Sequence, residues 1–590
     1  MQIVRITIQN FRCIREAVIH PVKNNVLLGP NNVGKTAVLE AINLTLNPEI
    51  GSRWRVIDEN DFFERNYLPP NEENEAPHIC IELVLAGMTG DDEDLFRENL
   101  VPWKTNSLEV IESAEEGVDP FADAIPAIRV FFDGWYDPEE DEFASGTFFL
   151  REASLPREDC PVFTKQHKRH IGFLIYRDFR ALTRPITLEP GNLFNTLLLS
   201  QEVQPKHFEE ALQGVRNALD PMAQEPDFSA LLSAYKTEIE RFLPLAGDEH
   251  PDLCFELTDM TREQVKAASQ LYVSSGCRRP IQKMGAGTRS LALLAILTLI
   301  MRRRKGGILA LEEPETFLYP HAQRRVIDEC IALASQMFVT THSPFVLERM
   351  PVEGVGRIEN NAGGLSWQPL LTANVKQINL YSKRLRQIHC EALMGRGVIV
   401  VEGDSDRWWL TGVSNALNGR VWQNRVQEAL ELQGISIVSA DSNGDIHKLC
   451  KFFHDSGLQT LALFDNSNQP AFLAEALTVP YPSLFLQAAG LEEVLSKHLP
   501  VDVLREMLLK ADQSRVPLLD EAIVNGLAET DIRQRSKDFL IANKGSGPMH
   551  FWIIERLQPS DFPDALCAVC NLATAYVSRH EDLGICTLVG

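Results

Sequence analysis

The hydrophobic pattern at the start of the chain predicts two strands, a loop and a helix. Apolar and polar positions alternate from Ile3 to Ile8, as in a strand with one buried face. The short apolar run from Val26 to Leu28 predicts a second, buried strand. From Thr36 to Leu46 apolar residues recur at helical spacing, and Asn47-Pro48 ends this predicted helix.

Two later segments alternate between strand and helix patterns. Such alternation predicts parallel sheets covered by helices, so we expect an α/β fold. The division between the two segments falls near Ser382-Lys383-Arg384. The predicted elements are helix 291–301, strand 308–311, helix 320–334 and strand 337–340 in the first segment, and strand 398–401, helix 407–417, strand 435–438, helix 446–456 and strand 460–464 in the second.

The stretch between these parts has a different pattern. Between Val56 and Cys160, short strand-like runs are separated by Pro, Gly and acidic residues, which predicts a β-rich lobe with acidic loops. From Leu193 to Phe242 the pattern is helical with few glycines. We therefore expect a helical arm or insertion there.

The charge of the chain is concentrated in the predicted lobe. The 590 residues carry a net charge of −24, and residues 56–160 hold 28 of the 81 acidic residues but only 6 of the 57 basic ones. A strongly acidic protein is a poor match for nucleic acid, because phosphate contacts are made by Lys and Arg. The rest of the chain is nearly neutral, so this objection applies to the lobe alone. The lobe is either a solvated surface or a partner surface.

Composition limits the class of protein. The apolar fraction of 44% and the charged fraction of 23% exclude disorder of the whole chain. The apolar run Leu291–Met301 is too short to span a bilayer, and the start lacks the apolar core of a signal peptide. The 11 cysteines are scattered, and Cys567-x-x-Cys570 is expected on a helix rather than on a metal. We expect a cytoplasmic protein.

One segment fits the phosphate-loop pattern G-x-x-x-x-G-K-[ST]. Gly29 to Thr36 reads Gly-Pro-Asn-Asn-Val-Gly-Lys-Thr, after a buried strand and at the start of a helix, as the pattern requires. Glycines let backbone N–H groups approach phosphates, and the helix N-terminus favours anions. Lys35 is expected to reach the β- and γ-phosphates and Thr36 to bind Mg²⁺. The candidate nucleotide-binding residues of the loop are Gly29, Asn31, Asn32, Gly34, Lys35 and Thr36.

Three further motifs support an ATP site. The strand ending at Leu311 leads into Glu312 and Glu313, of which one carboxylate can hold Mg²⁺ and the next can polarise the attacking water. The following strand leads into His342, which can sense the γ-phosphate. A loop of small residues that opens a helix can also approach a phosphate; its candidate residues are Gly285, Gly287 and Ser290.

These motifs together resemble the ABC-type ATPases of the RecF/SMC class. The resemblance rests on Asn10-Phe11-Arg12, the phosphate loop, Glu312-Glu313-Pro314-Glu315 and Thr341-His342-Ser343-Pro344. It implies two heads that sandwich ATP, with the loop 285–290 touching the nucleotide of the other protomer. Glu312 stands where that class usually has Asp, and the loop does not read Leu-Ser-Gly-Gly-Gln.

A second group of carboxylates follows strands of the later segment. Glu402, Asp404 and Asp406 come after the strand 398–401, and Asp465 comes after the strand 460–464. The carboxyl ends of parallel strands form the sites of α/β sheets. Carboxylates that converge there repel one another unless cations join them, and oxygen ligands suit Mg²⁺ or Mn²⁺. Two such ions can activate water and stabilise the leaving oxygen of a phosphodiester.

The two strands resemble a TOPRIM domain, and the ordered pair of domains resembles the OLD (overcoming lysogenization defect) family of nucleases. That family includes the Gabija nuclease subunit and retron-associated proteins. The resemblance implies a further acid in a Leu-Glu context, matched by Glu492 rather than Glu493, and a downstream lysine, matched by Lys544. It also implies an ATPase domain over 1–380, with the lobe 56–160 and a dimerising arm over 193–270, and a TOPRIM domain over 385–590.

One position departs from the TOPRIM pattern. The second acid of Asp-x-Asp is Ser467 here, and a hydroxyl is a poorer metal ligand than a carboxylate. The expected metal ligands are therefore Glu402, Asp406, Asp465, Ser467 and Glu492, with Thr36 and Glu312 at the ATP site. Asp441 and Asp445 are alternatives that compensate for Ser467 or simply form a turn.

The resulting hypothesis is an ATP-controlled, metal-dependent DNA endonuclease or nickase in phage defence. Glu402, Asp465 and Lys544 are its expected catalytic residues, with Glu313 and His342 in ATP hydrolysis. An alternative is a non-nuclease ATPase with a degenerate TOPRIM domain that binds DNA or a partner; a topoisomerase or primase is a third. The family implies a homodimer or larger oligomer and, in some members, a helicase or a retron reverse transcriptase with its RNA. The expected DNA-contacting residues are the basic groups 165–170 and 302–305.

Overall fold

The computed structural model describes most of both predicted domains. The described residues are 1–50, 56–69, 76–111, 121, 123–151, 159–177, 195–197, 214, 271–275, 277–304, 306–370, 387–417, 426, 428–465, 474–510, 521–581, 583 and 586–589. Most of the predicted arm, the expected boundary at 382–384, Lys305 and Ser467 lie outside them. None of the helices in the described ranges is long and apolar enough to cross a membrane.

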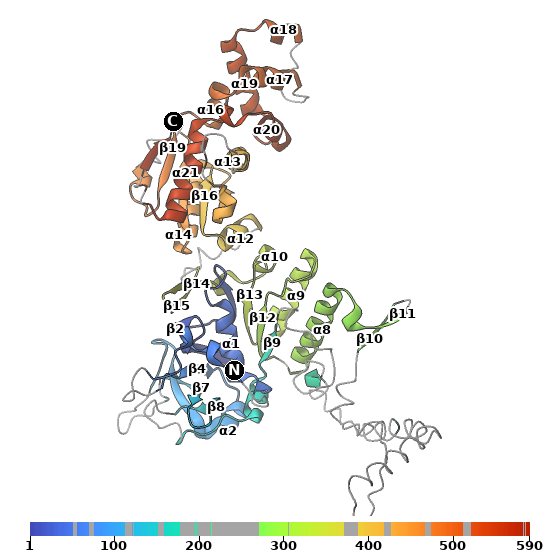
Figure 1. Cartoon of the computed structure of the whole chain (residues 1–590), viewed down its shortest axis with the longest axis vertical. Helices are drawn as coiled ribbons and strands as arrows, with labels where there is room; N and C mark the ends of the chain where they lie inside the picture. The colour runs from blue at the N-terminus through green and yellow to red at the C-terminus, as the bar shows by residue number, and fades with distance from the viewer. Residues whose placement is uncertain are drawn as a thin grey trace, which may run out of the picture.

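Thirteen strands of the described N-terminal part form one mixed sheet (Figure 1). Its parallel part places β3 (Asn24–Leu28) beside β13 (Gln336–Thr340), and β13 beside β12 (Ile308–Glu312), with Val26 opposite Val339 and Glu312 opposite Thr340. These strands are buried on both faces, which explains their continuous apolar sequences. Because all three run in the same direction, the residues that follow them meet at one edge of the sheet.

The acidic segment extends this sheet instead of forming a separate one. β4 (Ile79–Ala86) pairs with β1 (Gln2–Phe11), and β7 (Ile125–Asp137) pairs with β4. One of its acids, Glu82, lies in two ion pairs with a side chain that is 14% exposed: its Oε1 is 2.6 Å from Arg5 and 3.1 Å from Arg129. Burial raises the pKa of Glu82, but these two guanidinium groups outweigh it and hold the pKa below its ordinary value. Part of the segment's negative charge therefore holds the sheet together.

Helices cover both faces of the sheet. α1 (Lys35–Leu46) is buried along almost its whole length because it packs against strands of both parts. The remaining described elements of this domain are β2 (Ile14–Ile19), α2 (Gly90–Phe96), β5 (Leu100–Lys104), β6 (Glu109–Val110), β8 (Glu142–Phe149), α3 (Lys165–Ile171), β9 (Leu174–Tyr176), β10 (Tyr272–Ser275), β11 (Cys277–Pro280), α8 (Ala286–Arg304), α9 (Pro320–Leu333), α10 (Pro344–Leu347), β14 (Val355–Asn361) and β15 (Gly364–Pro369).

The C-terminal sheet has five parallel strands in the order β17-β16-β18-β19-β20. Its first three strands coincide with the predicted ones, within two residues at each end. Cys567 and Cys570 are buried on α21, as expected from their spacing. The elements are α12 (Gln387–Met394), β16 (Gly397–Val401), α13 (Asp404–Leu417), β17 (Ile435–Ser439), α14 (Asn443–Asp455), β18 (Gln459–Phe464), β19 (Ser483–Leu486), α21 (Asp564–Arg579) and β20 (Cys586–Val589).

A helical extension, which the sequence analysis did not foresee, interrupts this sheet domain between β19 and α21. Figure 1 shows it at the end of the molecule farthest from the N-terminal sheet. Its helices bury one apolar face each, which is typical of amphipathic helices. They are α16 (Leu491–His498), α17 (Val501–Lys510), α18 (Glu521–Gly526), α19 (Glu529–Ala542) and α20 (Gly547–Ile554).

The two sheet domains meet through a buried arginine. Arg357, on β14, is 9% exposed and donates both terminal nitrogens to Gly395 O at 3.2 Å, and one to Leu393 O at 3.5 Å. These carbonyls belong to the end of α12 and the turn after it, just before β16. A cation satisfies the unpaired carbonyls of a helix C-terminus and matches its partial negative charge. Arg357 therefore joins the N-terminal sheet to the first strand of the C-terminal one.

We predict that Gly354→Ala destabilises the N-terminal domain. An added Cβ at Gly354 would lie 1.5 Å from Asn24 O, a backbone atom of the strand before the phosphate loop. Overpacking of this kind costs about 1–3 kcal/mol, and each kcal/mol lowers a melting midpoint by about 2–4 °C in a domain of this size. Differential scanning calorimetry measures the change. Gly90→Ala, where nothing lies within 4 Å, is the matched control and should melt like the wild type.

Candidate ATP and TOPRIM sites

The loop between β3 and α1 has the backbone conformation of a phosphate loop. Gly29 and Gly34 have φ of +150° and +113°, and Asn32 lies in the left-handed region at +65°. An added Cβ on Gly29 would lie 2.9 Å from Ile358 O, so β14 requires a glycine there. Asn360 Nδ2 donates to Val33 O at 3.3 Å, which ties the loop to β14 from the other side.

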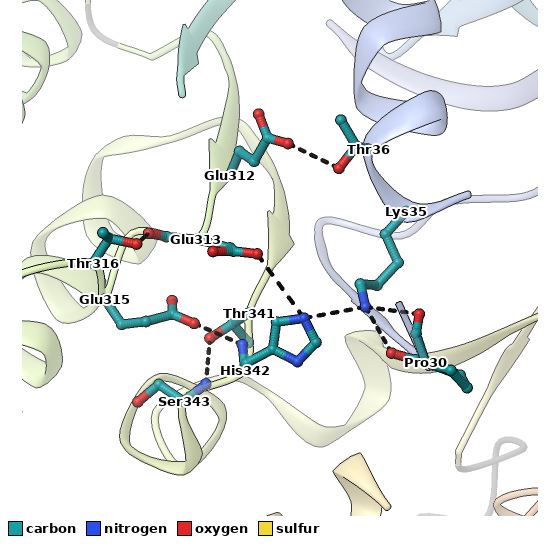
Figure 2. A network of polar contacts seen from close by, with 11 residues as sticks. Pro30, Lys35, Thr36, Glu312, Glu313, Glu315, Thr316, Thr341, His342 and Ser343 are labelled. Atoms are coloured by element: carbon teal, nitrogen blue, oxygen red, sulfur yellow. Dashed lines mark hydrogen bonds and ion pairs between the residues drawn. The ribbon is translucent and has the colours of Figure 1, made fainter. Parts of the chain in front are cut away.

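Lys35 is held inside this loop. Its Nζ donates to Gly29 O at 2.6 Å and Pro30 O at 3.0 Å, and lies 3.3 Å from His342 Nε2 (Figure 2). Burial lowers the pKa of Lys35, and the nearby Glu313 carboxylate opposes that shift. The ammonium group therefore lies where the loop's N–H groups and the start of α1 would place a phosphate.

The residues after β12 and β13 meet the loop as predicted. Thr36 Oγ1 donates to Glu312 Oε1 at 2.8 Å, so the hydroxyl and carboxylate expected to bind Mg²⁺ are adjacent. Figure 2 shows His342 between Lys35 and Glu313, with Nε2 of His342 4.0 Å from Glu313 Oε1. Burial and Lys35 lower the pKa of His342, while Glu313 raises it. The net direction favours a neutral imidazole, which can accept or donate one proton at Nε2.

Glu315 positions the histidine and was not among the predicted site residues. Its Oε1 accepts the backbone N–H of His342 at 2.6 Å, and burial raises the pKa of Glu315. Glu313 has φ of +43°, and its N–H donates to Thr340 O at 2.9 Å. This strained turn directs two successive carboxylates to different partners. The fourth residue of the motif Glu-Glu-Pro-Glu is Glu315, and its carboxylate reaches the residue that follows β13. The motif therefore contained a sequence signal for this residue.

The loop 285–290 forms the start of α8. Gly287 is required by packing, because an added Cβ would lie 2.8 Å from Phe317 O. Ser290 is fully buried, whereas an added Cβ on Gly285 would meet nothing within 4 Å. Contact of this loop with a nucleotide held by a second protomer stays a prediction.

A cavity of about 690 Å³ adjoins the phosphate loop. It lies on the side of Asn31 and Asn32, and its wall includes Arg12, Phe63 and Asn360. Arg12 Nε donates to Asp61 Oδ1 at 2.9 Å. An aromatic ring, a guanidinium and amides are suited to the nucleoside part of a nucleotide.

At the C-terminal sheet, the residues after β16 and β18 converge. Asn443, at the start of α14 and beyond β17, donates one amide nitrogen to Glu402 Oε2 at 3.0 Å and to Asp465 Oδ1 at 3.2 Å. Burial raises the pKa of Glu402, as does the Asp465 carboxylate, and Lys544 opposes them. The predicted acids are thus adjacent, and Asn443 joins them although the sequence analysis did not select it.

Asp406 lies at the edge of this group. Its Oδ2 accepts the backbone N–H of Gly403 at 3.0 Å, and burial raises its pKa to about 7. The geometry therefore gives Asp406 a part in shaping the loop after β16. Asp406 as a metal ligand stays a prediction.

Glu492, not Glu493, faces the other acids. Glu492 is buried, its Oε1 lies 3.2 Å from Lys544 Nζ, and an added Cβ on Gly490 would touch both Glu492 Oε2 and Asp465 Oδ2, at 3.1 and 3.6 Å. Burial lowers the pKa of Lys544, but Glu492 and neighbouring carboxylates outweigh it and raise the pKa. Glu493 instead pairs with two other lysines, which lower its pKa to about 2.

The donor atoms of this group suit a divalent cation. Glu402, Asp465 and Glu492 offer carboxylate oxygens, and the missing Cβ of Gly490 leaves space beside two of them. Across the described ranges, no three His, Cys, Asp or Glu side chains are arranged as a ready-made metal site. The carboxylates are instead joined by the Asn443 amide and by Lys544. Asp445, ion-paired with Lys448 at 2.9 Å, and Asp441, at φ +65°, have the contacts of turn residues.

The basic residues expected to contact DNA are largely paired within the chain. Lys168 is buried, and burial lowers its pKa to about 8. Lys165 lies 3.1 Å from Glu49, His170 lies 2.7 Å from Asp92, and Arg302 lies 2.6 Å from Glu329. Their acidic partners come from distant segments, so the sequence alone did not indicate these pairs.

Known proteins resemble both parts of the chain. A family model described as "AAA ATPase domain" matches residues 1–113 and 195–347, and one described as "Overcoming lysogenization defect protein-like, TOPRIM domain" matches residues 393–466. The Old nuclease of Escherichia phage P2 is 20% identical over 503 residues, covering 79% of this chain and 77% of that protein. The uncharacterized protein YbjD of Escherichia coli (strain K12) is 24% identical over 492 residues, covering 79% of each.

Solved structures of SMC heads also show a distant likeness. The SMC head domain from Thermotoga maritima is 11% identical with a TM-score of 0.27, covering 63% of this chain and 100% of that one. The SMC head bound to the C-terminal winged-helix domain of ScpA is 13% identical with a TM-score of 0.35, covering 64% and 99%. At such low scores, the fold assignment rests on the strand order and loop geometry described above.

The matched domain models and the strand order define an N-terminal ATPase domain with a phosphate loop, the head, joined to a C-terminal TOPRIM domain. This ordered pair, with the similarity to the phage P2 protein, is consistent with an OLD family protein and confirms the resemblance seen in the motifs.

We predict that Glu313→Gln separates ATP binding from hydrolysis. The substitution keeps the side-chain size but removes the carboxylate near His342, so general-base catalysis is lost while Lys35 and Thr36 remain. Loss of such a base lowers turnover by about 100-fold or more. ATP affinity, measured by fluorescence titration, should stay within about threefold of wild type. Hydrolysis unchanged relative to the exposed control Glu353→Gln would contradict this role.

Proposed function

We propose that this protein is an ATP-controlled, metal-dependent DNA endonuclease or nickase of the OLD type that acts in defence against phage. The observation that carries the proposal is the convergence of Glu402, Asp465 and Glu492 on one sheet edge beside Lys544. The TOPRIM match and the similarity to a protein named a nuclease support it.

Each residue of the TOPRIM group has a proposed role. Glu402, Asp465 and Glu492 hold Mg²⁺ or Mn²⁺, which when bound supplies Lewis-acid stabilisation and an activated water. Glu402 is also proposed to take a proton, because its carboxylate lies beside Asp465, joined to it by the Asn443 amide. Lys544, which pairs with Glu492 at 3.2 Å, neutralises charge that develops on the phosphate.

The head binds and hydrolyses ATP in this proposal. Lys35 binds the β- and γ-phosphates, and Thr36 with Glu312 holds the Mg²⁺ that accompanies ATP. Glu313 orients the attacking water, and His342 senses the γ-phosphate. The cavity of about 690 Å³ beside the phosphate loop takes the nucleoside. Dimerisation of heads would add the loop 285–290 of a second protomer.

Two contacts connect the nucleotide loop to the TOPRIM domain. On β14, Ile358 O packs against Gly29, and Asn360 donates a hydrogen bond to Val33 O. Arg357 of the same strand donates to Gly395 O in the turn before β16. α10, which follows His342 and Ser343, packs on α12, the helix that leads into β16. A change in the phosphate loop or at His342 would therefore shift the strand that ends at Glu402. This is the proposed route of ATP control.

The alternative is an ATPase that binds DNA or a partner and does not cut. Ser467 in place of the second acid favours it, because a hydroxyl binds Mg²⁺ less well than a carboxylate. In either case the partners proposed are DNA, a second copy of the chain and, as in some relatives, a second defence component. Metal-dependent cleavage distinguishes the two functions.

We predict that the wild-type chain nicks supercoiled plasmid with Mg²⁺ or Mn²⁺ and that Glu402→Ala does not. Removing a ligand of the cluster should lower the rate by about 100-fold or more. Agarose electrophoresis of the plasmid forms measures it. Asp502→Asn is the control, because Asp502 lies on α17 outside the carboxylate group, is 94% exposed and pairs with Arg505 at 3.2 Å. Full nicking by Glu402→Ala would contradict the site.

We predict that Arg357→Ala uncouples the two domains. ATP hydrolysis should stay within about twofold of wild type, because the substitution leaves the phosphate loop intact, while nicking should lose its response to ATP. Parallel ATPase and nicking assays over a range of ATP concentrations measure this. Arg349→Ala, a half-exposed arginine 3.9 Å from Asp328, is the control and should keep the response. An Arg357→Ala chain with an unchanged ATP response would refute this route.

A further inference from the structure

Asn443 has an unusual position among the carboxylates of the TOPRIM group. It is 9% exposed, and its single amide nitrogen donates to both Glu402 and Asp465. Its other amide atom, Oδ1, is buried and accepts no hydrogen bond from the described residues. A buried carbonyl oxygen without a donor is destabilising, so its position requires an explanation.

The nitrogen takes a place that suits a cation. Two carboxylate oxygens, each within 3.2 Å of the same Nδ2, lie no more than about 6 Å apart, where two full negative charges repel each other. The partial positive charge of the N–H group relieves this only in part. A divalent ion between the two carboxylates would relieve their repulsion fully. Such an ion would then lie next to the Asn443 amide, which contacts both carboxylates.

The amide can present either end to that ion. The oxygen and nitrogen of an Asn side chain have nearly the same shape and exchange places by a half-turn about Cβ–Cγ. After that half-turn, Oδ1 lies where Nδ2 now lies, between the two carboxylates. An amide oxygen is a hard ligand suited to Mg²⁺ and Mn²⁺.

We propose that Asn443 is a metal ligand of the TOPRIM site, whose amide oxygen adds a donor beside the carboxylates of Glu402 and Asp465. This assignment rests on the proposed metal site. In the structure the amide nitrogen joins Glu402 and Asp465, and the proposal has the amide turn on ion binding so that Oδ1 faces the ion. Asn443 thus takes the compensating role considered for Asp441, two residues before it, and Asp445, two residues after it on α14.

The test is Mn²⁺ binding to the full-length chain without DNA or nucleotide, measured by isothermal titration calorimetry. The Mn²⁺ binding event that is present in the wild type and absent in Glu402→Ala is assigned to the TOPRIM site. Asn443→Leu, which keeps the shape but has no oxygen, should weaken that binding about tenfold or more. Asn443→Asp should bind Mn²⁺ at least as tightly as wild type, and Mn²⁺ should raise its melting midpoint more. Asp441→Asn, exposed in the same loop, should bind like wild type.

Two results would overturn the assignment. Asn443→Leu with wild-type Mn²⁺ affinity would show that the side chain is not a ligand. Asn443→Asp as weak as Asn443→Leu would show that the amide acts only as a donor that holds two acids together. Nicking is measured on the same samples. A wild-type chain that binds Mn²⁺ as expected but cuts no DNA would contradict the proposed nuclease and leave the assignment of Asn443 intact.

Discussion

The repulsion between Glu402 and Asp465 is the constraint on which the account of the C-terminal domain depends. Two parallel strands, β16 and β18, pair side by side, so the residues that follow them, Glu402 and Asp465, are brought close together. Burial adds to the cost of charging both, which is why the pKa of Glu402 is raised. The amide nitrogen of Asn443 and the ammonium group of Lys544 offset part of this repulsion. A site that holds acids together in this way is prepared for a cation.

The head uses the same principle with a different result. There too, parallel strands bring side chains to one edge, where Lys35 lies beside His342 and close to Glu313. Lys35, Glu313 and His342 form a mixed-charge group whose charges offset one another, suited to a phosphate with its own metal ion. The two sites are connected by β14. Its Ile358 packs against Gly29 of the phosphate loop, and its Arg357 donates to Gly395 O in the turn before β16.

The sequence predicted the parts that depend on local patterns. The strands and helices around both sites follow their apolar periodicity, and the phosphate loop was recognised from its order of strand, loop and helix. The choice of Glu492 over Glu493 depends on helix phase after Gly490, which the family pattern supplied and periodicity did not. The helical extension was missed because its amphipathic helices contain no motif.

Residues that act through distant contacts were not predictable. Asn443 follows a third strand, and its approach to Glu402 depends on the order of strands in the sheet. Arg357 resembles any arginine in a strand until its carbonyl partners are known. The basic residues near Lys168 looked available for DNA, yet their partners Glu49 and Asp92 lie far away in the sequence. Each case depends on contacts between residues that are far apart in the sequence. Local hydrophobic patterns and motifs give no information about such contacts.

The central claim is that the TOPRIM carboxylates form a cation site. The most direct measurement is anomalous X-ray scattering at the manganese edge from crystals of the full-length chain grown with Mn²⁺. The account predicts a peak between Glu402 and Asp465, within coordination distance of both and of Asn443, that disappears in Glu402→Ala. Well-ordered crystals with Mn²⁺ at the head and no peak at these residues would contradict it.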